Sequence, residues 1–62
     1  MRPIDDMELR LEWFDFSQHL RVIHEGVVLY NSRVRIVSPL LSDRQVKWIT
    51  EHYEQKRKKY VF

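Results

Sequence analysis

Apolar and charged residues alternate near the start of the chain. From Met7 to Trp13 every second residue is apolar, and each residue between them is charged. This period of two is typical of a β-strand with one buried face, and a strand is the interpretation we favour. A helix is the alternative for residues 5–24, because apolar residues also recur there at helical spacing and Asp5 with Glu8 has the spacing of a capping box.

Short apolar runs separated by turn residues continue to residue 37. Further strands are expected at residues 20–23, 27–30 and 33–37. Gly26, the only glycine, lies between the first two runs, where a tight turn favours a positive φ. Asn31 and Ser32 form a second plausible two-residue turn, and Pro39 ends the pattern because proline cannot donate to a sheet.

The last third of the chain predicts one helix, from about residue 43 to 59. Ser42 and Gln45 have the spacing of a reciprocal capping box, in which each side chain bonds the backbone of the other. Leu41 and Val46 occupy the two positions of a hydrophobic staple. The helix start is therefore well defined by the sequence.

The predicted fold is α+β. A small antiparallel sheet of three to four short strands, within residues 7–37, is covered on one face by the C-terminal helix, in the order β-β-β-α, and residues 1–62 form one domain with frayed ends. The strands are expected to contribute to the core Leu9, Leu11, Trp13, Leu20, Val22, Val34 and Ile36. The helix is expected to contribute Val46, Ile49, Tyr53 and, near its end, Tyr60.

The other face of the predicted sheet keeps apolar side chains. They are Phe14, Ile23, Val28 or Tyr30. Apolar surface of this kind, beside an unpaired sheet edge, predicts a homodimer or another protein partner.

Composition narrows the class of protein. The chain is 44% hydrophobic and 13% aromatic, so it carries enough apolar residues to fold. It has no cysteine, which excludes disulfides and thiolate metal sites and is typical of a reducing compartment; we expect a cytoplasmic location. No apolar run approaches the roughly 18 residues of a membrane span, and none resembles a signal sequence.

Charge is distributed unevenly, although the formal net charge is only +2. Within residues 1–15, acidic side chains outnumber basic ones, whereas within residues 44–59 basic side chains outnumber acidic ones. The run Lys56-Arg57-Lys58-Lys59 complements the negative end of the helix dipole and creates a local positive field. A solvated helix end explains such a run without any function, and binding to nucleic-acid phosphates is the functional alternative.

We favour a non-enzymatic, nucleic-acid-binding or nucleic-acid-associated regulator that contacts DNA or RNA through backbone phosphates. Trp48 lies on a neighbouring helix face, where it either packs against a strand end at the edge of the core or, as an exposed aromatic ring among cations, suits stacking on a base. The candidate nucleic-acid-binding residues are Arg44, Lys47, Trp48, His52, Lys56, Arg57, Lys58 and Lys59. Arg33 and Arg35 would extend this surface if they share the exposed side of one strand. The alternative is a protein-interaction module, such as an adaptor, an inhibitor or a phage-type factor, that binds through its aromatic sheet face.

Catalytic and metal-binding patterns are weak. His19, His24 and His52 fall in different predicted elements, and no paired nucleophile and base or glycine-rich phosphate loop occurs. A zinc site can be drawn from His19 and His24, but their spacing is not specific. No enzyme activity, cofactor or metal is expected.

The stretch Leu-Ser-Asp-Arg-Gln-Val-Lys-Trp and the basic residues after it, at positions 41–59, resemble the third, DNA-reading helix of homeodomains. That resemblance implies a three-helix fold that reads the major groove, with an asparagine holding adenine and basic residues on phosphates. Here His52 stands near the asparagine position, Glu54 replaces a phosphate-contacting arginine, and Trp48-Ile49 replaces the Trp-Phe pair of the core. Residues 20–37 also predict strands where a second helix is required. We interpret the likeness as convergence on good helix-start chemistry.

Overall fold

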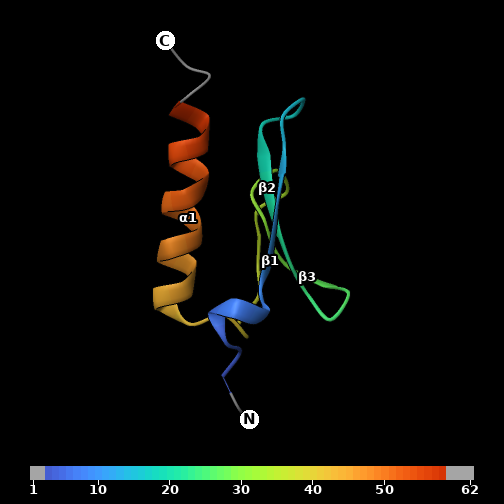
Figure 1. The fold of residues 1–62 in the computed structure, drawn as a ribbon, viewed down its shortest axis with the longest axis vertical. Coiled ribbons are helices and arrows are strands. Elements are labelled where there is room, and N and C mark those ends of the chain that lie inside the picture. The colour runs from blue at the N-terminus through green and yellow to red at the C-terminus, as the bar shows by residue number, and fades with distance from the viewer. Residues whose placement is uncertain (1–2, 59–62) are drawn as a thin grey trace.

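One helix lies against one face of a four-stranded antiparallel sheet (Figure 1). The computed structural model describes residues 3–58. The elements are the 3-10 helix η1 (Asp6–Glu8), strands β1 (Arg10–Phe14), β2 (His19–His24), β3 (Val27–Asn31) and β4 (Ile36–Val37), and helix α1 (Asp43–Lys58). The strands are neighbours in chain order, β1-β2-β3-β4. The predicted α+β class, with a helix after the sheet, is confirmed.

The N-terminal segment forms a strand after a short 3-10 turn. The helical alternative for residues 5–24 is wrong, since only the three residues of η1 are helical there. Asp5 caps η1 through its Oδ1, which accepts a hydrogen bond from the backbone N of Met7 at 3.1 Å. This local bond keeps Met7 out of the strand and leaves its side chain exposed, so β1 begins at Arg10, three residues later than the alternation suggests.

The turn between β2 and β3 has two residues, Glu25 and Gly26, with φ angles of 51° and 76°. Two consecutive positive φ angles match the turn type whose twist suits a tight hairpin, as expected for Gly26. Farther along, Val22 pairs with Tyr30 and Ile23 pairs with Val28, so β3 has one extra residue between these pairs. This bulge buries Tyr30 in the core, so of the two alternatives for the uncovered face, Val28 or Tyr30, the second is wrong.

The connection from β3 to β4 differs most from the sequence interpretation. Asn31 still belongs to β3, residues 32–35 form the turn, and β4 has only two residues. The Oδ1 of Asn31 accepts a hydrogen bond from the backbone N of Arg33 at 3.0 Å, and Arg35 adopts a φ of 57°. Because the turn takes up most of the predicted strand, Val34 and Ile36 are 60% and 45% exposed, and their assignment to the core is wrong.

The core lies between α1 and the facing side of the sheet. The side chains that are almost fully buried are Leu20, Leu29, Ile49 and Val22. The expected core positions of Leu9, Leu20, Val22 and Ile49 are confirmed. Partly buried residues packed on this cluster are Ile4, Leu11, Trp13, Val46 and Tyr53. Tyr60 lies outside the described residues.

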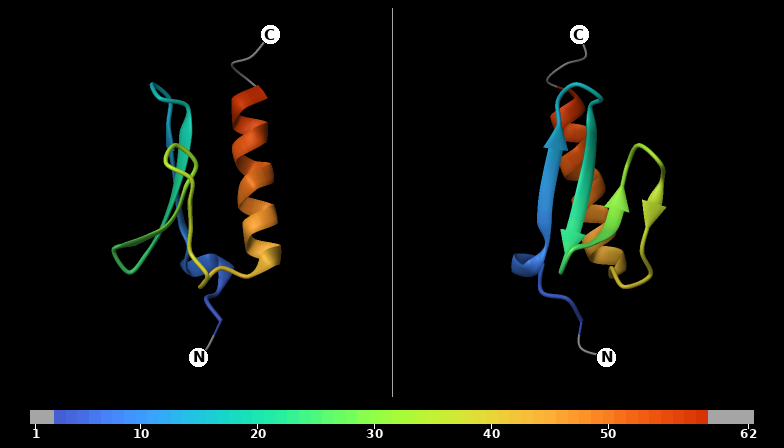
Figure 2. Two further views of the ribbon diagram at one scale, coloured as in Figure 1. Left: turned by 180° about the vertical axis from the view of Figure 1, so that it is seen from behind. Right: turned by 90° about the vertical axis from the view of Figure 1, so that its right-hand side faces the viewer.

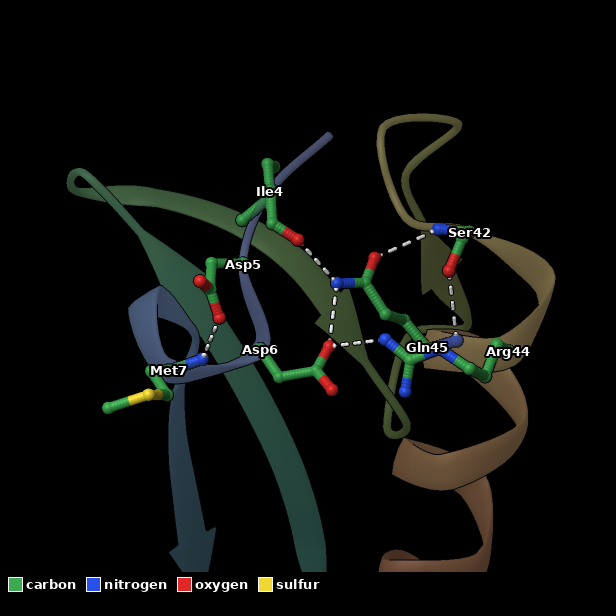
Figure 3. A network of polar contacts seen from close by, with 7 residues as sticks. All are labelled: Ile4, Asp5, Asp6, Met7, Ser42, Arg44 and Gln45. Atoms are coloured by element: carbon green, nitrogen blue, oxygen red, sulfur yellow. Dashed lines mark hydrogen bonds and ion pairs between the residues drawn. The ribbon is translucent and has the colours of Figure 1, made fainter. Parts of the chain in front are cut away.

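The start of α1 is joined to the N-terminal segment by a network of polar contacts (Figure 3). Gln45 N donates to Ser42 Oγ at 3.1 Å, and Ser42 N donates to Gln45 Oε1 at 3.0 Å, which confirms the capping box. Gln45 Nε2 also donates to the backbone oxygen of Ile4 at 2.7 Å and to Asp6 Oδ1 at 2.9 Å. Gln45 is only 3% exposed, so one buried amide caps the helix and holds the segment before the sheet.

A sheet occupies residues 10–37, where a homeodomain would have its second helix. The resemblance to that family is therefore confined to the chemistry of the helix start. Among residues 3–58, no helix is long and apolar enough to cross a membrane.

Candidate nucleic-acid interface

The predicted binding residues divide between the two ends of α1. Arg44 and Lys47 lie in its first turns, and Lys56, Arg57 and Lys58 lie in its last turn. A rise of 1.5 Å per residue separates Arg44 from Arg57 by about 20 Å along the helix axis. The structure therefore does not bring the candidates within residues 3–58 into one patch. Lys59 lies outside the described residues.

Arg44 is engaged within the protein. Its Nη2 atom donates to Asp6 Oδ1 at 2.9 Å (Figure 3). The hydrogen bond from Arg44, followed by that from Gln45, holds the pKa of the Asp6 carboxyl below its usual value, and Asp6 in turn raises the pKa of Arg44. Asp6 thus stays ionised at neutral pH and balances the charge of Arg44, which removes this arginine from the set of uncompensated cations.

Trp48 and His52 lie along the side of α1 between its two ends. Trp48 is 37% exposed, and His52 is half-buried. Nine residues separate Trp48 from Arg57, a rise of about 13 Å. Trp48 is therefore available to solvent but does not belong to the cationic end.

The last turn of α1 carries cations that are not neutralised by the described part of the chain. Arg57 and Lys58 are exposed, and Lys56 is half-buried. None of the three forms an ion pair with a carboxylate of residues 3–58. The Arg57 guanidinium lies 5.7 Å from the centre of the Tyr53 ring, and its Nη1 lies 3.4 Å from the Tyr53 hydroxyl.

Aromatic packing fixes this end of the helix over the sheet. The rings of Trp13 in β1 and Tyr53 in α1 have their centres 6.2 Å apart and are tilted by 51°. The Trp13 Nε1 atom donates to Asp15 Oδ1 at 2.6 Å, which joins the ring to the β1–β2 turn. The Arg57 side chain therefore packs on the ring of Tyr53, and Tyr53 in turn contacts Trp13 of the sheet. Both views in Figure 2 place the β1–β2 turn and the C-terminal end of α1 at the same end of the molecule.

A hollow of about 290 Å³ lies at this end, where three segments meet. It is lined by Ser17, Gln18, His19, Ser32, Arg33, Tyr53 and Arg57. Two arginines, one from the β3–β4 turn and one from α1, contribute to a lining that has no carboxylate among residues 3–58. Arg33 and Arg35 do not share the exposed side of a strand, because both lie in the β3–β4 turn, and only Arg33 lines the hollow.

The pKa of His19 reflects its partial burial and the positive charges near the hollow. Partial burial, and then the charges of Arg33 and Arg21, lower the pKa of the His19 imidazole, so the ring is neutral at neutral pH. Ser17 Oγ and His19 Nδ1 are joined by a short hydrogen bond. Sequence reasoning missed Ser17, His19 and Ser32 as site residues, because nothing in their spacing shows that they meet.

On the face of the sheet away from α1, side chains of β1 and β2 pack on one another. His19 stacks on Phe14 with the ring centres 4.6 Å apart, and the Arg21 guanidinium lies 4.9 Å above the Phe14 ring. Arg21 also pairs with Glu12 at 2.7 Å across the strands. Phe14 is consequently half-buried, and the aromatic surface on this face is smaller than the sequence suggests.

Among residues 3–58, no three histidine, aspartate or glutamate side chains are grouped so that they could hold a metal ion.

In the comparisons with known proteins, no family model, no curated protein and no solved structure matches this chain.

Proposed function

We propose that the protein is a non-enzymatic nucleic-acid-binding protein that contacts backbone phosphates with the C-terminal end of α1. The observation that carries this proposal is that Lys56, Arg57 and Lys58 have no carboxylate partner among residues 3–58, while Arg33 and Arg57 line the same hollow. Cations grouped without internal partners are an electrostatic footprint for phosphates.

Two further features support phosphate binding. The three cations lie in the last helical turn, where the helix dipole favours positive charge, so they can gather at little cost in stability. Arginine presents a planar fork of donors that matches a phosphate in two hydrogen bonds, and the hollow has two arginines. Contacts of this kind give affinity without reading a base sequence.

The replacement of Lys56, Arg57 and Lys58 by glutamine is expected to reduce the salt dependence of binding. Each lost phosphate contact lowers the slope of log affinity against log salt concentration by about 0.9 for duplex DNA and about 0.7 for a single strand. The total reduction should be roughly 2 to 3 if all three residues contact phosphates. Fluorescence anisotropy of a labelled oligonucleotide, measured between about 50 and 200 mM salt, gives this slope.

A matched comparison uses two double variants: the first replaces Arg57 and Lys58 with glutamine, and the second replaces the exposed Arg10 and Lys47, which lie in β1 and in the first turns of α1. Both variants lose the same charge, so a general effect of net charge would weaken both equally. The proposal requires a clearly larger loss in the first variant. Equal losses, or a wild-type protein that binds neither DNA nor RNA, would contradict it.

A second candidate function is protein binding, with a second copy of the chain or another protein as partner. It is favoured by a largely apolar hollow of about 500 Å³ at the opposite end of the molecule, lined by Pro3, Ile4, His24, Glu25, Val27, Leu29, Pro39 and Leu40. Val27 and Leu40 are exposed beside it. An interaction that survives in the Lys56/Arg57/Lys58 variant but is lost in Val27→Asp would favour this candidate.

A further inference from the structure

We propose that the hollow between the β1–β2 turn, the β3–β4 turn and α1 holds one phosphate of a single-stranded nucleic acid between Arg33 and Arg57, while Phe16 stacks on a neighbouring base. This inference rests on the proposed function and adds to it the kind of strand and the point of contact.

The lining of the hollow supplies donors suited to an anion. The Arg33 side chain has no hydrogen bond or ion pair with residues 3–58; only its backbone N is engaged, with Asn31. Ser32 Oγ accepts a hydrogen bond from the backbone N of Leu20 at 2.9 Å, so its own proton is free to be donated. The guanidinium groups of Arg33 and Arg57 can form charge-assisted hydrogen bonds with a phosphate, and the Ser32 hydroxyl can donate a further one.

The size of the hollow agrees with one phosphate and part of its sugar. Its volume of about 290 Å³ is roughly ten times the 30 Å³ share of one water. It falls at the lower limit of about 300 Å³ for pockets that enclose a drug-sized ligand. A nucleic-acid strand whose backbone passes through the hollow, with its bases outside, fits this space better than an enclosed cofactor.

The anionic nature of the occupant also agrees with the surrounding field. Partial burial, followed by the charges of Arg33 and Arg21, lowers the pKa of His19 and so disfavours a positive charge on its ring. Asp15 lies in the adjacent turn but accepts a hydrogen bond from Trp13, and it does not line the hollow. A phosphate would offset the repulsion between Arg33 and Arg57, which both line the hollow.

Phe16 distinguishes a single strand from a duplex. It lies in the turn of residues 15–18, next to Ser17 of the hollow, and its side chain is fully exposed at 105%. The faces of unpaired bases are open for stacking on aromatic side chains, whereas duplex bases already stack on one another. Figure 1 shows the β1–β2 turn projecting at the end where α1 finishes, so a strand held in the hollow can reach it.

Arg33→Gln, compared with Arg35→Gln, tests the hollow. Both arginines lie in the same turn and both substitutions remove one charge, but only Arg33 lines the hollow. The probes are a fluorescein-labelled ten-nucleotide oligothymidylate and a blunt duplex of ten base pairs. Arg33→Gln is expected to weaken oligothymidylate binding roughly tenfold or more, the effect of losing a charged hydrogen bond. Arg35→Gln, at an exposed position outside the hollow, should have less than about a threefold effect.

Phe16→Ala tests the stacking contact, with the exposed Met7 at the other end of the molecule as its control. Phe16→Ala should weaken oligothymidylate binding roughly tenfold and leave duplex binding unchanged, while Met7→Ala should change neither. All four positions are exposed, so far-ultraviolet circular dichroism should show wild-type folding.

The outcomes separate this inference from the proposed function. Equal losses in Arg33→Gln and Arg35→Gln would overturn the phosphate position in the hollow and leave general phosphate binding intact. Duplex binding as tight as oligothymidylate binding, with no effect of Phe16→Ala, would overturn the single-strand assignment. A wild-type protein that binds neither probe, even at low salt, would overturn both the inference and the proposed function.

Discussion

Replacement of Gln45 by alanine is expected to lower the free energy of unfolding by about 2 to 3 kcal/mol. The substitution removes the side-chain half of the capping box and leaves the backbone oxygen of the half-buried Ile4 without the Gln45 donor. It also removes one of the two donors to Asp6 Oδ1. For a domain of this size the melting temperature should fall by roughly 10 to 20 °C, which thermal denaturation followed by circular dichroism can measure.

Two variants separate the causes of that loss. Gln55→Ala makes the same chemical change at an exposed position of α1 and should change stability by less than about 0.5 kcal/mol. Gln45→Glu keeps an acceptor for Ser42 N but removes both donated bonds and places a second carboxylate near Asp6. If Gln45→Ala were no worse than Gln55→Ala, the N-terminal segment would not be held to the helix as described.

Ile49→Ala is expected to cost about 2 to 5 kcal/mol, because a large buried side chain is replaced by a small one and the surrounding core only partly collapses. Ile49 is fully buried between α1 and the sheet. A domain of this size rarely has more than about 3 to 5 kcal/mol of stability, so much of the variant should be unfolded at 25 °C. Urea denaturation followed by tryptophan fluorescence would give the difference.

Ile36→Ala is the matched control for the core. It deletes the same atoms, but from a side chain that the sequence pattern places in the core and the structure leaves 45% exposed. Its cost should be well below that of Ile49→Ala. Similar costs for the two substitutions would mean that β4 packs more deeply than described.

Elements defined by neighbouring residues were predicted well from the sequence. The capping box of Ser42 and Gln45 is a local contact, so its spacing alone identified the start of α1. Gly26 marked the β2–β3 turn for the same reason, since few other residues adopt a positive φ at low cost. Alternation also identified the buried sides of β1 and β2 through Leu11, Leu20 and Val22.

Features that depend on distant residues or on local competition could not be predicted. The bulge in β3 moves Tyr30 into the core by adding one residue to one strand, which a period of two cannot show. The hydrogen bond between the Asn31 side chain and Arg33 extends a turn at the expense of a strand. The pair of Arg44 and Asp6 joins residues that are 38 positions apart.

For the candidate site too, local features were predicted from the sequence and contacts between distant residues were not. The sequence identified the cations of the last helical turn because they are consecutive. It could not show that Arg33 lines the same hollow as Arg57, since the two are brought together by the packing of a turn against a helix. Nor could it show that Tyr53, supported by Trp13, carries the Arg57 side chain.

The most direct test of the binding account is a nuclear magnetic resonance titration of ¹⁵N-labelled protein with unlabelled oligothymidylate. Binding as proposed should shift the amide signals of residues 16–19, 32–33 and 53–58, which lie at the cationic end of the molecule. Amide signals near the apolar hollow, at residues 24–27 and 40, should stay in place. Shifts confined to that opposite end, or none at any ratio of oligonucleotide to protein, would contradict the account.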